Sequence, residues 1–276
     1  MRLAALRVEL AKLYRQRSAY AGFAVMLALA ALVTWGSHRQ RHHLDVSEAV
    51  PSEFVVAGKT VTALFVAQAV MEPSLVVMVP VLIAVVAGAL VAGERQTGTL
   101  RTLLTRPVRR WVVLTAKLLA GWSYAILITL FLGLCTLGLG QAVFGWGDLV
   151  VFRGGLTILD AHTGLIRLAE GYGLAAGAMC VVAALALMLS TIFDNAMVAA
   201  GLTVALLILS NTIGVMPYFE DVKPHLLTTH LRLYREVFAA TVDTEALTIS
   251  VHYLAAYLAA IVVVALAVFA RRDVTC

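Results

Sequence analysis

Residues 74–93 read SLVVMVPVLIAVVAGALVAG, a stretch of 20 residues without a charged side chain. About 20 such residues are enough for a helix to cross the hydrocarbon core of a bilayer. The sequence then changes abruptly at residue 93 to GERQTGTLRTLLTRPVRR, which is polar and basic. It becomes apolar again after Lys117. This pattern predicts a membrane-spanning helix that leads directly into a compact basic segment.

The composition of the whole chain agrees with an integral membrane protein. Of its 276 residues, 61% are hydrophobic and 13% are charged, whereas soluble domains have about 25% charged residues. The mean hydropathy is +0.92. These values exclude an ordinary water-soluble enzyme or binding domain.

Five further stretches of sufficient length lack Asp, Glu, Lys and Arg. The six predicted spans are 18–37, 74–93, 118–147, 171–193, 196–219 and 246–270. They predict an all-α integral membrane protein in which residues 1–276 form a single transmembrane domain. The fourth and fifth spans are separated by Asp194 and Asn195 alone, which predicts a tight antiparallel hairpin.

Residues 2–17, RLAALRVELAKLYRQR, show a helical pattern before the first span. The apolar side chains recur at helical spacing and leave most charged residues on other faces. They are Leu3, Leu6, Leu10, Leu13 and Tyr14. We expect an amphipathic helix that lies in the membrane interface; a plain basic tail is the alternative.

The basic residues predict the orientation of the spans. If both termini lie inside, the inner segments hold 13 of the 21 Lys and Arg residues and four of the 16 acids. Lys and Arg are enriched in cytoplasmic loops, so both termini are expected in the cytoplasm. The basic charge of the chain is therefore a topology signal and does not indicate nucleic-acid binding.

Three outer segments are then expected, at 38–73, 148–170 and 220–245. The first carries His38, His42 and His43. The i,i+4 spacing of His38 and His42 would suit a metal on a helix, but we interpret the segment as a polar loop and expect no metal. Residues 54–71 either form a short external helix or extend the second span. Residues 163–170 could form one or two helical turns, and 220–245 predict an external amphipathic helix.

Several catalytic and nucleotide-binding motifs are absent from the sequence. It contains no G-x-x-x-x-G-K-[ST] phosphate loop, no H-E-x-x-H and no G-x-S-x-G. We therefore expect no enzyme activity and no cofactor in this chain. Ionisable residues inside spans usually mark ion or proton paths, and the predicted spans contain only His252. This absence favours energy supplied by another subunit.

Uncharged polar residues do occur inside the predicted spans. Ser123, Thr129, Ser190, Thr191, Thr203, Ser210, Asn211 and Thr212 are of this kind. Their default role is helix packing through interhelical hydrogen bonds. Ser210 and Asn211 are the candidates for a substrate path.

The basic segment at 94–117 has a helical pattern of its own. Gly98 permits a sharp turn, Thr97 or Thr99 can cap a short helix, and Pro107 disfavours helix at Arg106. Leu100, Leu103 and Leu104 share one face of that helix. A short amphipathic helix on the cytoplasmic face is suited to docking in the groove of a partner.

This segment resembles the corresponding loop of ABC-2-type permeases, the membrane subunits of ATP-binding-cassette transporters. The family pattern is an acidic residue after the second span, then Gly-Thr-Leu, Leu-Leu, Pro-Val with a basic residue, and Lys at the third span. The matching residues here are Glu94, Gly98, Thr99, Leu100, Leu103, Leu104, Pro107, Val108, Arg109 and Lys117. The motif covers about a tenth of the chain, and the six spans with an N-terminal interfacial helix match the family elsewhere.

The resemblance implies the ABC-2 permease fold, with a coupling helix between the second and third spans. The implied function is ATP-driven export by alternating access at the plasma membrane of a bacterium, in a dimer with a second copy or a related permease. Two cytoplasmic ATPase subunits would bind ATP and Mg. The residues implied to couple to them are Glu94, Gly98, Thr99, Leu100, Leu103, Leu104, Arg106 and Pro107. The alternatives are a membrane scaffold or sensor that recruits partners without transport, and a polytopic membrane enzyme.

Overall fold

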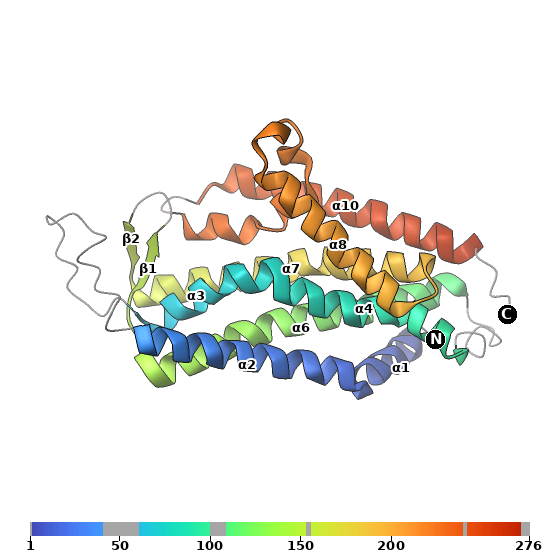
Figure 1. The fold of residues 1–276 in the computed structure, drawn as a ribbon, viewed down its shortest axis with the longest axis horizontal. Helices are drawn as coiled ribbons and strands as arrows, with labels where there is room; N and C mark the ends of the chain where they lie inside the picture. Colours follow the sequence, from blue (N-terminus) through green and yellow to red (C-terminus); the bar gives the residue numbers. More distant parts are fainter. Residues whose placement is uncertain (1, 41–60, 100–108, 153–155, 240–241, 272–276) are drawn as a thin grey trace, which may run out of the picture.

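A computed structural model of the chain describes residues 2–40, 61–99, 109–152, 156–239 and 242–271. Within these ranges the structure is mostly helical, and six helices are long and apolar enough to cross a membrane. Most of them lie along the long axis of the molecule, and α8 is inclined to it (Figure 1). The chain is therefore a multi-pass membrane protein of the all-α class, as the sequence predicts.

The helices run back and forth along the bundle. α1 (Arg2–Arg15) is followed by α2 (Arg17–Gln40), α3 (Ala63–Pro73), η2 (Ser74–Met78), α4 (Val79–Gln96) and α6 (Arg110–Phe144). After a β-hairpin come α7 (Ala161–Ile192), α8 (Ala196–Val215) and α10 (Thr244–Arg271). We call the end where α1 begins and α10 ends the basal end, and the opposite one the hairpin end (Figure 1).

α7 and α4 form the centre of the bundle. Most residues are buried in the apolar parts of α7 and of the span that contains α4, whereas fewer than a third are buried in those of α2, α8 and α10. Apolar side chains on those outer helices suit contact with lipid. α4 and α8 approach closely at Gly88, where an added Cβ would lie 3.1 Å from the backbone nitrogen of Ala200. A small residue at this position therefore allows the two helices to pack in contact.

The second span is longer than its charge-free stretch. The helix begins at Ala63, runs through α3, η2 and α4, and ends at Gln96. Residues 63–71 thus extend the span, one of the two alternatives for this region. Pro80 has no N–H to donate to the Val76 carbonyl, and the wider π-helical turn η2 lies directly before α4. A π-helical turn within an α-helix is a common adjustment of this kind.

Other predicted boundaries need correction. α6 begins at Arg110 instead of 118 and ends at Phe144, α7 begins at Ala161 instead of 171, and α8 ends at Val215 instead of 219. A charge-free stretch marks only the apolar part of a span, and a helix continues through polar residues that are capped or paired. Asp160, for example, caps α7 by accepting a hydrogen bond from His162 N. Residues 163–170 therefore belong to α7.

The hairpin end carries two strands that the sequence analysis did not predict. β1 (Leu149–Phe152) pairs antiparallel with β2 (Leu156–Leu159), with Leu149 opposite Leu159. Leu149 is fully buried, because α7 has Gly164 where a Cβ would lie 2.8 Å from the Leu149 side chain. The side chains of Leu149, Val150 and Val151 on β1 are thus buried at the end of the bundle.

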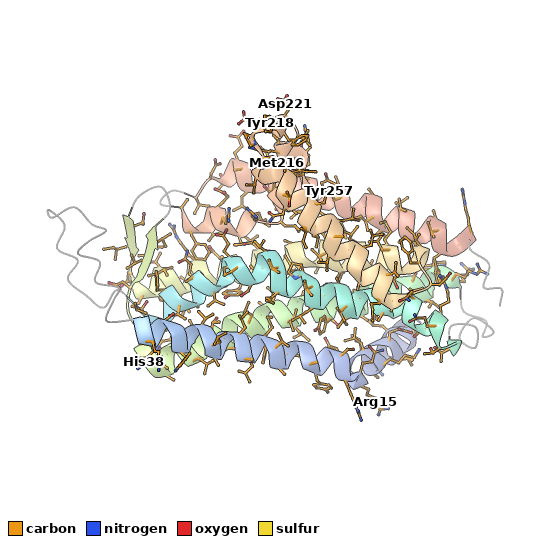
Figure 2. The ribbon with its side chains drawn as sticks, viewed as in Figure 1. Arg15, His38, Met216, Tyr218, Asp221 and Tyr257 are labelled. Carbon is orange, nitrogen blue, oxygen red and sulfur yellow. The ribbon has the colours of Figure 1, made fainter. Side chains whose placement is uncertain are left out.

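The segment between α8 and α10 is irregular rather than one amphipathic helix. Its elements are η3 (Pro217–Phe219), η4 (Lys223–His225), α9 (Leu227–His230) and η5 (Leu233–Phe238). Prolines at 217 and 224 interrupt any longer helix. η5 buries Tyr234 and Phe238, whereas the turn that carries Tyr218 and Asp221 protrudes from the side of the bundle (Figure 2).

Candidate functional site

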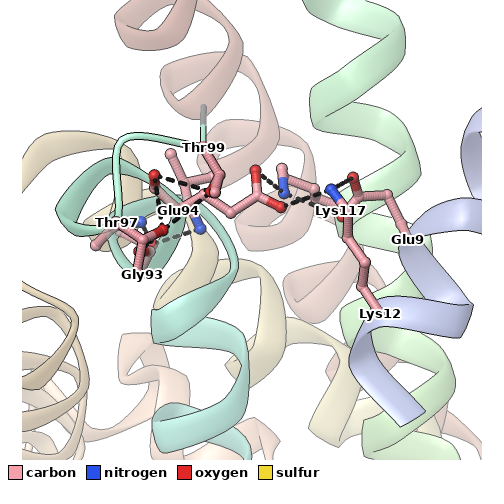
Figure 3. A network of polar contacts seen from close by, with 10 residues as sticks. Glu9, Lys12, Gly93, Glu94, Thr97, Thr99 and Lys117 are labelled. Atoms are coloured by element: carbon pink, nitrogen blue, oxygen red, sulfur yellow. Dashed lines mark hydrogen bonds and ion pairs between the residues drawn. The ribbon is translucent and has the colours of Figure 1, made fainter. Parts of the chain in front are cut away.

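Four charged side chains form one cluster at the basal end (Figure 3). Glu9 and Lys12 come from α1, Glu94 from the last turn of α4, and Lys117 from the third turn of α6. The cluster therefore joins three helices that are far apart in sequence. Glu94 and Lys117 lie on either side of segment 97–109, the connection between α4 and α6.

Lys117 is the centre of the cluster. Its Nζ lies 3.0 Å from Glu9 Oε2 and 2.8 Å from Glu94 Oε2. Lys12 Nζ contacts the second oxygen of each carboxylate, at 3.4 Å from Glu9 Oε1 and 3.1 Å from Glu94 Oε1. Two acids and two bases thus balance one another, with both oxygens of each carboxylate engaged.

The burial of these groups makes the pairing necessary. Lys117 and Glu9 have exposed fractions of 0% and 5%, and a charge removed from water is very costly unless it is paired. Lys12 is more exposed. Burial by itself would lower the pKa of Lys12, but the charges of Glu9 and Glu94 outweigh it and raise the pKa above its usual value. Lys12 therefore remains positively charged at physiological pH.

α4 ends in a closed turn directly after Glu94. Gly98 has a φ of 71°, which glycine adopts without strain, and its N–H donates to Arg95 O at 3.1 Å. Thr97 Oγ1 donates to Gly93 O and Thr99 Oγ1 to Glu94 O. The two threonines thus close the end of α4. The helix that the sequence predicts one of them to cap lies outside the described residues.

Two further contacts fasten the same end of the bundle. Arg95 Nη1 lies 2.6 Å from Asp194 Oδ1, which joins the end of α4 to the turn between α7 and α8. Arg110 Nη1 donates to Ala270 O at 3.1 Å, which joins the start of α6 to the end of α10. Together with the cluster, these contacts connect both ends of segment 97–109 to α1, the α7–α8 turn and α10.

The remaining residues predicted for coupling cannot be placed in the same way. Leu100, Leu103, Leu104, Arg106 and Pro107 lie outside the described residues. Glu94, Gly98 and Thr99 lie together at the end of α4. The amphipathic face of segment 100–107 therefore remains a prediction from the sequence.

Ser210 and Asn211 lie elsewhere, on the last turns of α8. Ser210 Oγ is 2.8 Å from Thr228 Oγ1, and Asn211 Oδ1 accepts a hydrogen bond from Arg232. Asn211 also lines two hollows beside the segment 217–239. Both residues are thus in contact with the segment between α8 and α10, and neither contacts the charge cluster.

The sequence analysis did not identify Glu9 and Lys12 as partners of Lys117. It assigned both residues to the polar face of α1 and placed Lys117 just before the third span. In the structure Lys117 lies inside α6 and is completely buried. The available signal was the lysine itself, because a lysine that is drawn into a span usually pairs with an acidic side chain or a backbone carbonyl. Glu9 and Glu94 were the two acids in the N-terminal half of the predicted inner segments.

Among the described residues, no group of three or more His, Cys, Asp and Glu side chains could hold a metal ion. His38 lies in the last turn of α2, at the hairpin end (Figure 2). His42 and His43 lie outside the described residues.

Comparison with known proteins identifies the family of the chain. The uncharacterized protein YhcI of Bacillus subtilis (strain 168) is 27% identical over 197 residues, which cover 69% of this chain and 63% of that protein. The chain thus matches less than two thirds of the length of this relative. A family model described as "Protein of unknown function (DUF2705)" matches residues 24–275. The chain therefore belongs to the DUF2705 family.

Proposed function

We propose that the chain is the membrane-spanning permease subunit of an ATP-driven exporter of the ABC-2 type. A separate cytoplasmic ATPase supplies the energy, and two ATPase subunits act on a dimer of permeases at the plasma membrane. Six membrane-spanning helices provide the transmembrane part. The motif from Glu94 to Lys117 provides the resemblance to ABC-2 permeases.

The observation that carries the proposal is the charge cluster. Glu94 and Lys117, the first and last residues of the motif, pair at 2.8 Å and also share Glu9 and Lys12 of α1. The two residues that flank segment 100–107, Glu94 and Lys117, are thus bound to each other and to α1. A partner that binds this segment would therefore pull on all three helices. Movement of the docked segment would then move α1, α4 and α6 together.

The proposed orientation places the basal end in the cytoplasm. The described residues at that end include Arg7, Arg15, Arg95, Arg109 and Arg271. Basic residues next to membrane spans favour the cytoplasmic side. An ATPase in the cytoplasm would then meet the segment between α4 and α6 directly.

The proposal is tested by co-purification. The chain, with an affinity tag, is co-expressed with an ABC ATPase of its own organism, sought first in the genes next to its own, and purified in mild detergent. We expect the two proteins to elute as one complex with equal numbers of both subunits. ATP hydrolysis by the complex should stop when the phosphate-loop lysine of the ATPase is replaced.

A membrane scaffold or sensor would give a different result. In that case the chain would be purified without an ATPase, or with partners that lack a phosphate loop. Recovery of the chain without any ATPase, under conditions that keep it folded and monodisperse, would contradict the transporter proposal.

A further inference from the structure

A polar hollow of about 340 Å³ lies between the end of α8, the segment 217–239 and the start of α10. Three cations line it: Lys223, Arg232 and Arg235. Neutral hydrogen-bonding groups line it as well, and they are Asn211, Thr228, Thr229 and Ser250. The hollow therefore offers cationic and neutral donors around one space.

The charges around this hollow do not cancel. Glu236 also lines the hollow and is engaged in an interaction with another group. Arg235 forms an ion pair with Glu72. Three cations and one carboxylate, Glu236, therefore line the hollow, and Glu72 pairs with Arg235 from outside it. These five groups together leave one positive charge in excess. Arg232 is held in place by its hydrogen bond to Asn211. The hollow is therefore suited to a ligand that carries one negative charge.

An apolar crevice adjoins the hollow. It measures about 30 Å³ and shares Asn211, Thr228 and Arg232 with it. The other residues that line the crevice are mainly apolar: Leu75, Val76, Pro80, Leu207, Leu231 and Tyr234. A ligand in the hollow would thus meet apolar side chains of α4, η2 and α8 on one side.

The outer side of the hollow is also apolar and exposed. Val215 lines the hollow and is 73% exposed. Met216 and Tyr218 follow it on the turn that protrudes from the bundle (Figure 2). Asp221, at the tip of that turn, is not among the residues that line the hollow. Polar donors therefore lie next to apolar surface that a hydrocarbon chain could cover.

We propose that the hollow binds the phosphodiester headgroup of an anionic amphiphile, whose hydrocarbon part lies against the crevice and the exposed end of α8. Guanidinium groups match phosphate oxygens in geometry and charge. The Asn211 amide and the hydroxyl groups of Thr228 and Ser250 supply further donors, whereas the Thr229 hydroxyl already donates to Lys223 O. Binding of the amphiphile at this site does not require an ATPase. The inference that such an amphiphile is the exported substrate rests on the function proposed above.

The test is a binding titration of the purified chain in an uncharged detergent, without ATPase or ATP. The ligands are short-chain phosphatidylglycerol, short-chain phosphatidylcholine and glycerol 3-phosphate, and the readout is native mass spectrometry. We expect phosphatidylglycerol to bind at least about tenfold more tightly than the other two, because a hydrogen-bonded ion pair and apolar contact are both needed. If glycerol 3-phosphate binds as tightly as phosphatidylglycerol, the claim that the ligand needs a hydrocarbon part is wrong. If phosphatidylcholine binds as tightly, the claim that the site selects a net negative charge is wrong.

Two variants locate the site. Lys223→Gln and Arg232→Gln should each weaken phosphatidylglycerol binding by about tenfold or more. Arg39→Gln is the matched control, because Arg39 lies over the Trp35 ring in the last turn of α2 and does not line the hollow. We expect it to bind as the wild type does. Wild-type affinity in both Lys223→Gln and Arg232→Gln, with folding verified by thermal unfolding, would overturn the proposal.

The outcome is separate from that of the ATPase experiment. A negative titration would leave the permease assignment as it stands. Failure to capture an ATPase would in turn leave a positive titration unchanged.

Discussion

Replacing Lys117 with methionine is expected to lower the free energy of unfolding by about 3–5 kcal/mol. The Lys117 ammonium is buried between the carboxylates of Glu9 and Glu94, at 3.0 and 2.8 Å. Methionine fills a similar volume but leaves two carboxylates with Lys12 as their one remaining partner in the cluster. Breaking a buried pair by removing one partner is costly because an uncompensated charge stays buried. Thermal and denaturant unfolding in detergent micelles would measure the loss.

Two further variants make this result specific to charge balance. In Glu9→Gln/Lys117→Met the pair between Lys12 and Glu94, at 3.1 Å, stays balanced. We expect this double variant to regain at least about 1 kcal/mol relative to Lys117→Met, as residues of one network couple. Arg15→Gln, at an exposed position of α1 (Figure 2), should stay within about 0.5 kcal/mol of the wild type. Equal stability of Lys117→Met and Arg15→Gln would show that the cluster does not hold α1 to the bundle.

Replacing Leu100, Leu103 and Leu104 together with serine is expected to abolish docking of the ATPase. These residues share one face of the predicted coupling helix. Burial of one leucine side chain contributes about 1.5–3 kcal/mol, so loss of three should weaken the affinity by at least about 100-fold. Pull-down of the ATPase with the tagged chain would measure this, while membrane insertion and yield should stay unchanged.

The polar face of the same segment supplies the control. Thr102→Ala/Thr105→Ala changes residues that the helical pattern places away from the three leucines. We expect it to capture the ATPase as efficiently as the wild type does. Undiminished capture by the triple serine variant would refute the coupling assignment of this segment.

Much of the architecture follows from simple physical rules applied to the sequence. The bilayer requires about 20 apolar residues per helix, and this rule predicts the six long apolar helices found among the described residues. The turn at Gly98 follows equally directly, because its φ of 71° is one that glycine adopts without strain. The hairpin at Asp194 and Asn195 follows from the two spans on either side, and Asn195 caps α8 by accepting from Met197 N.

The charge cluster was harder to predict. Charge-free stretches exclude Lys117 by definition, although the helix that contains it begins at Arg110. Glu9 follows the same helical pattern as the exposed residues of α1, and its burial arises only when α1 packs against α6. Long-range pairing of this kind depends on tertiary structure, which a local pattern does not contain.

The segment between α8 and α10 shows the same limit. Its apolar residues fit a helical face, but Pro217 and Pro224 break the chain into short elements. Arg167, on α7, donates hydrogen bonds from its guanidinium group to the carbonyls of Val237 and Ala239. Contacts with distant helices therefore decide the path of this segment, and they bring Asn211, Arg232 and Lys223 around one hollow.

The central claim is that an ATPase docks on the segment between α4 and α6. Photo-crosslinking tests it most directly, with a benzophenone amino acid at Leu103 in the co-expressed complex. The control position is Ile158, which is 52% exposed on β2 at the hairpin end. We predict a covalent adduct between the chain and the ATPase from position 103 and none from position 158. No adduct at 103, or equal adducts at both positions, would contradict the account.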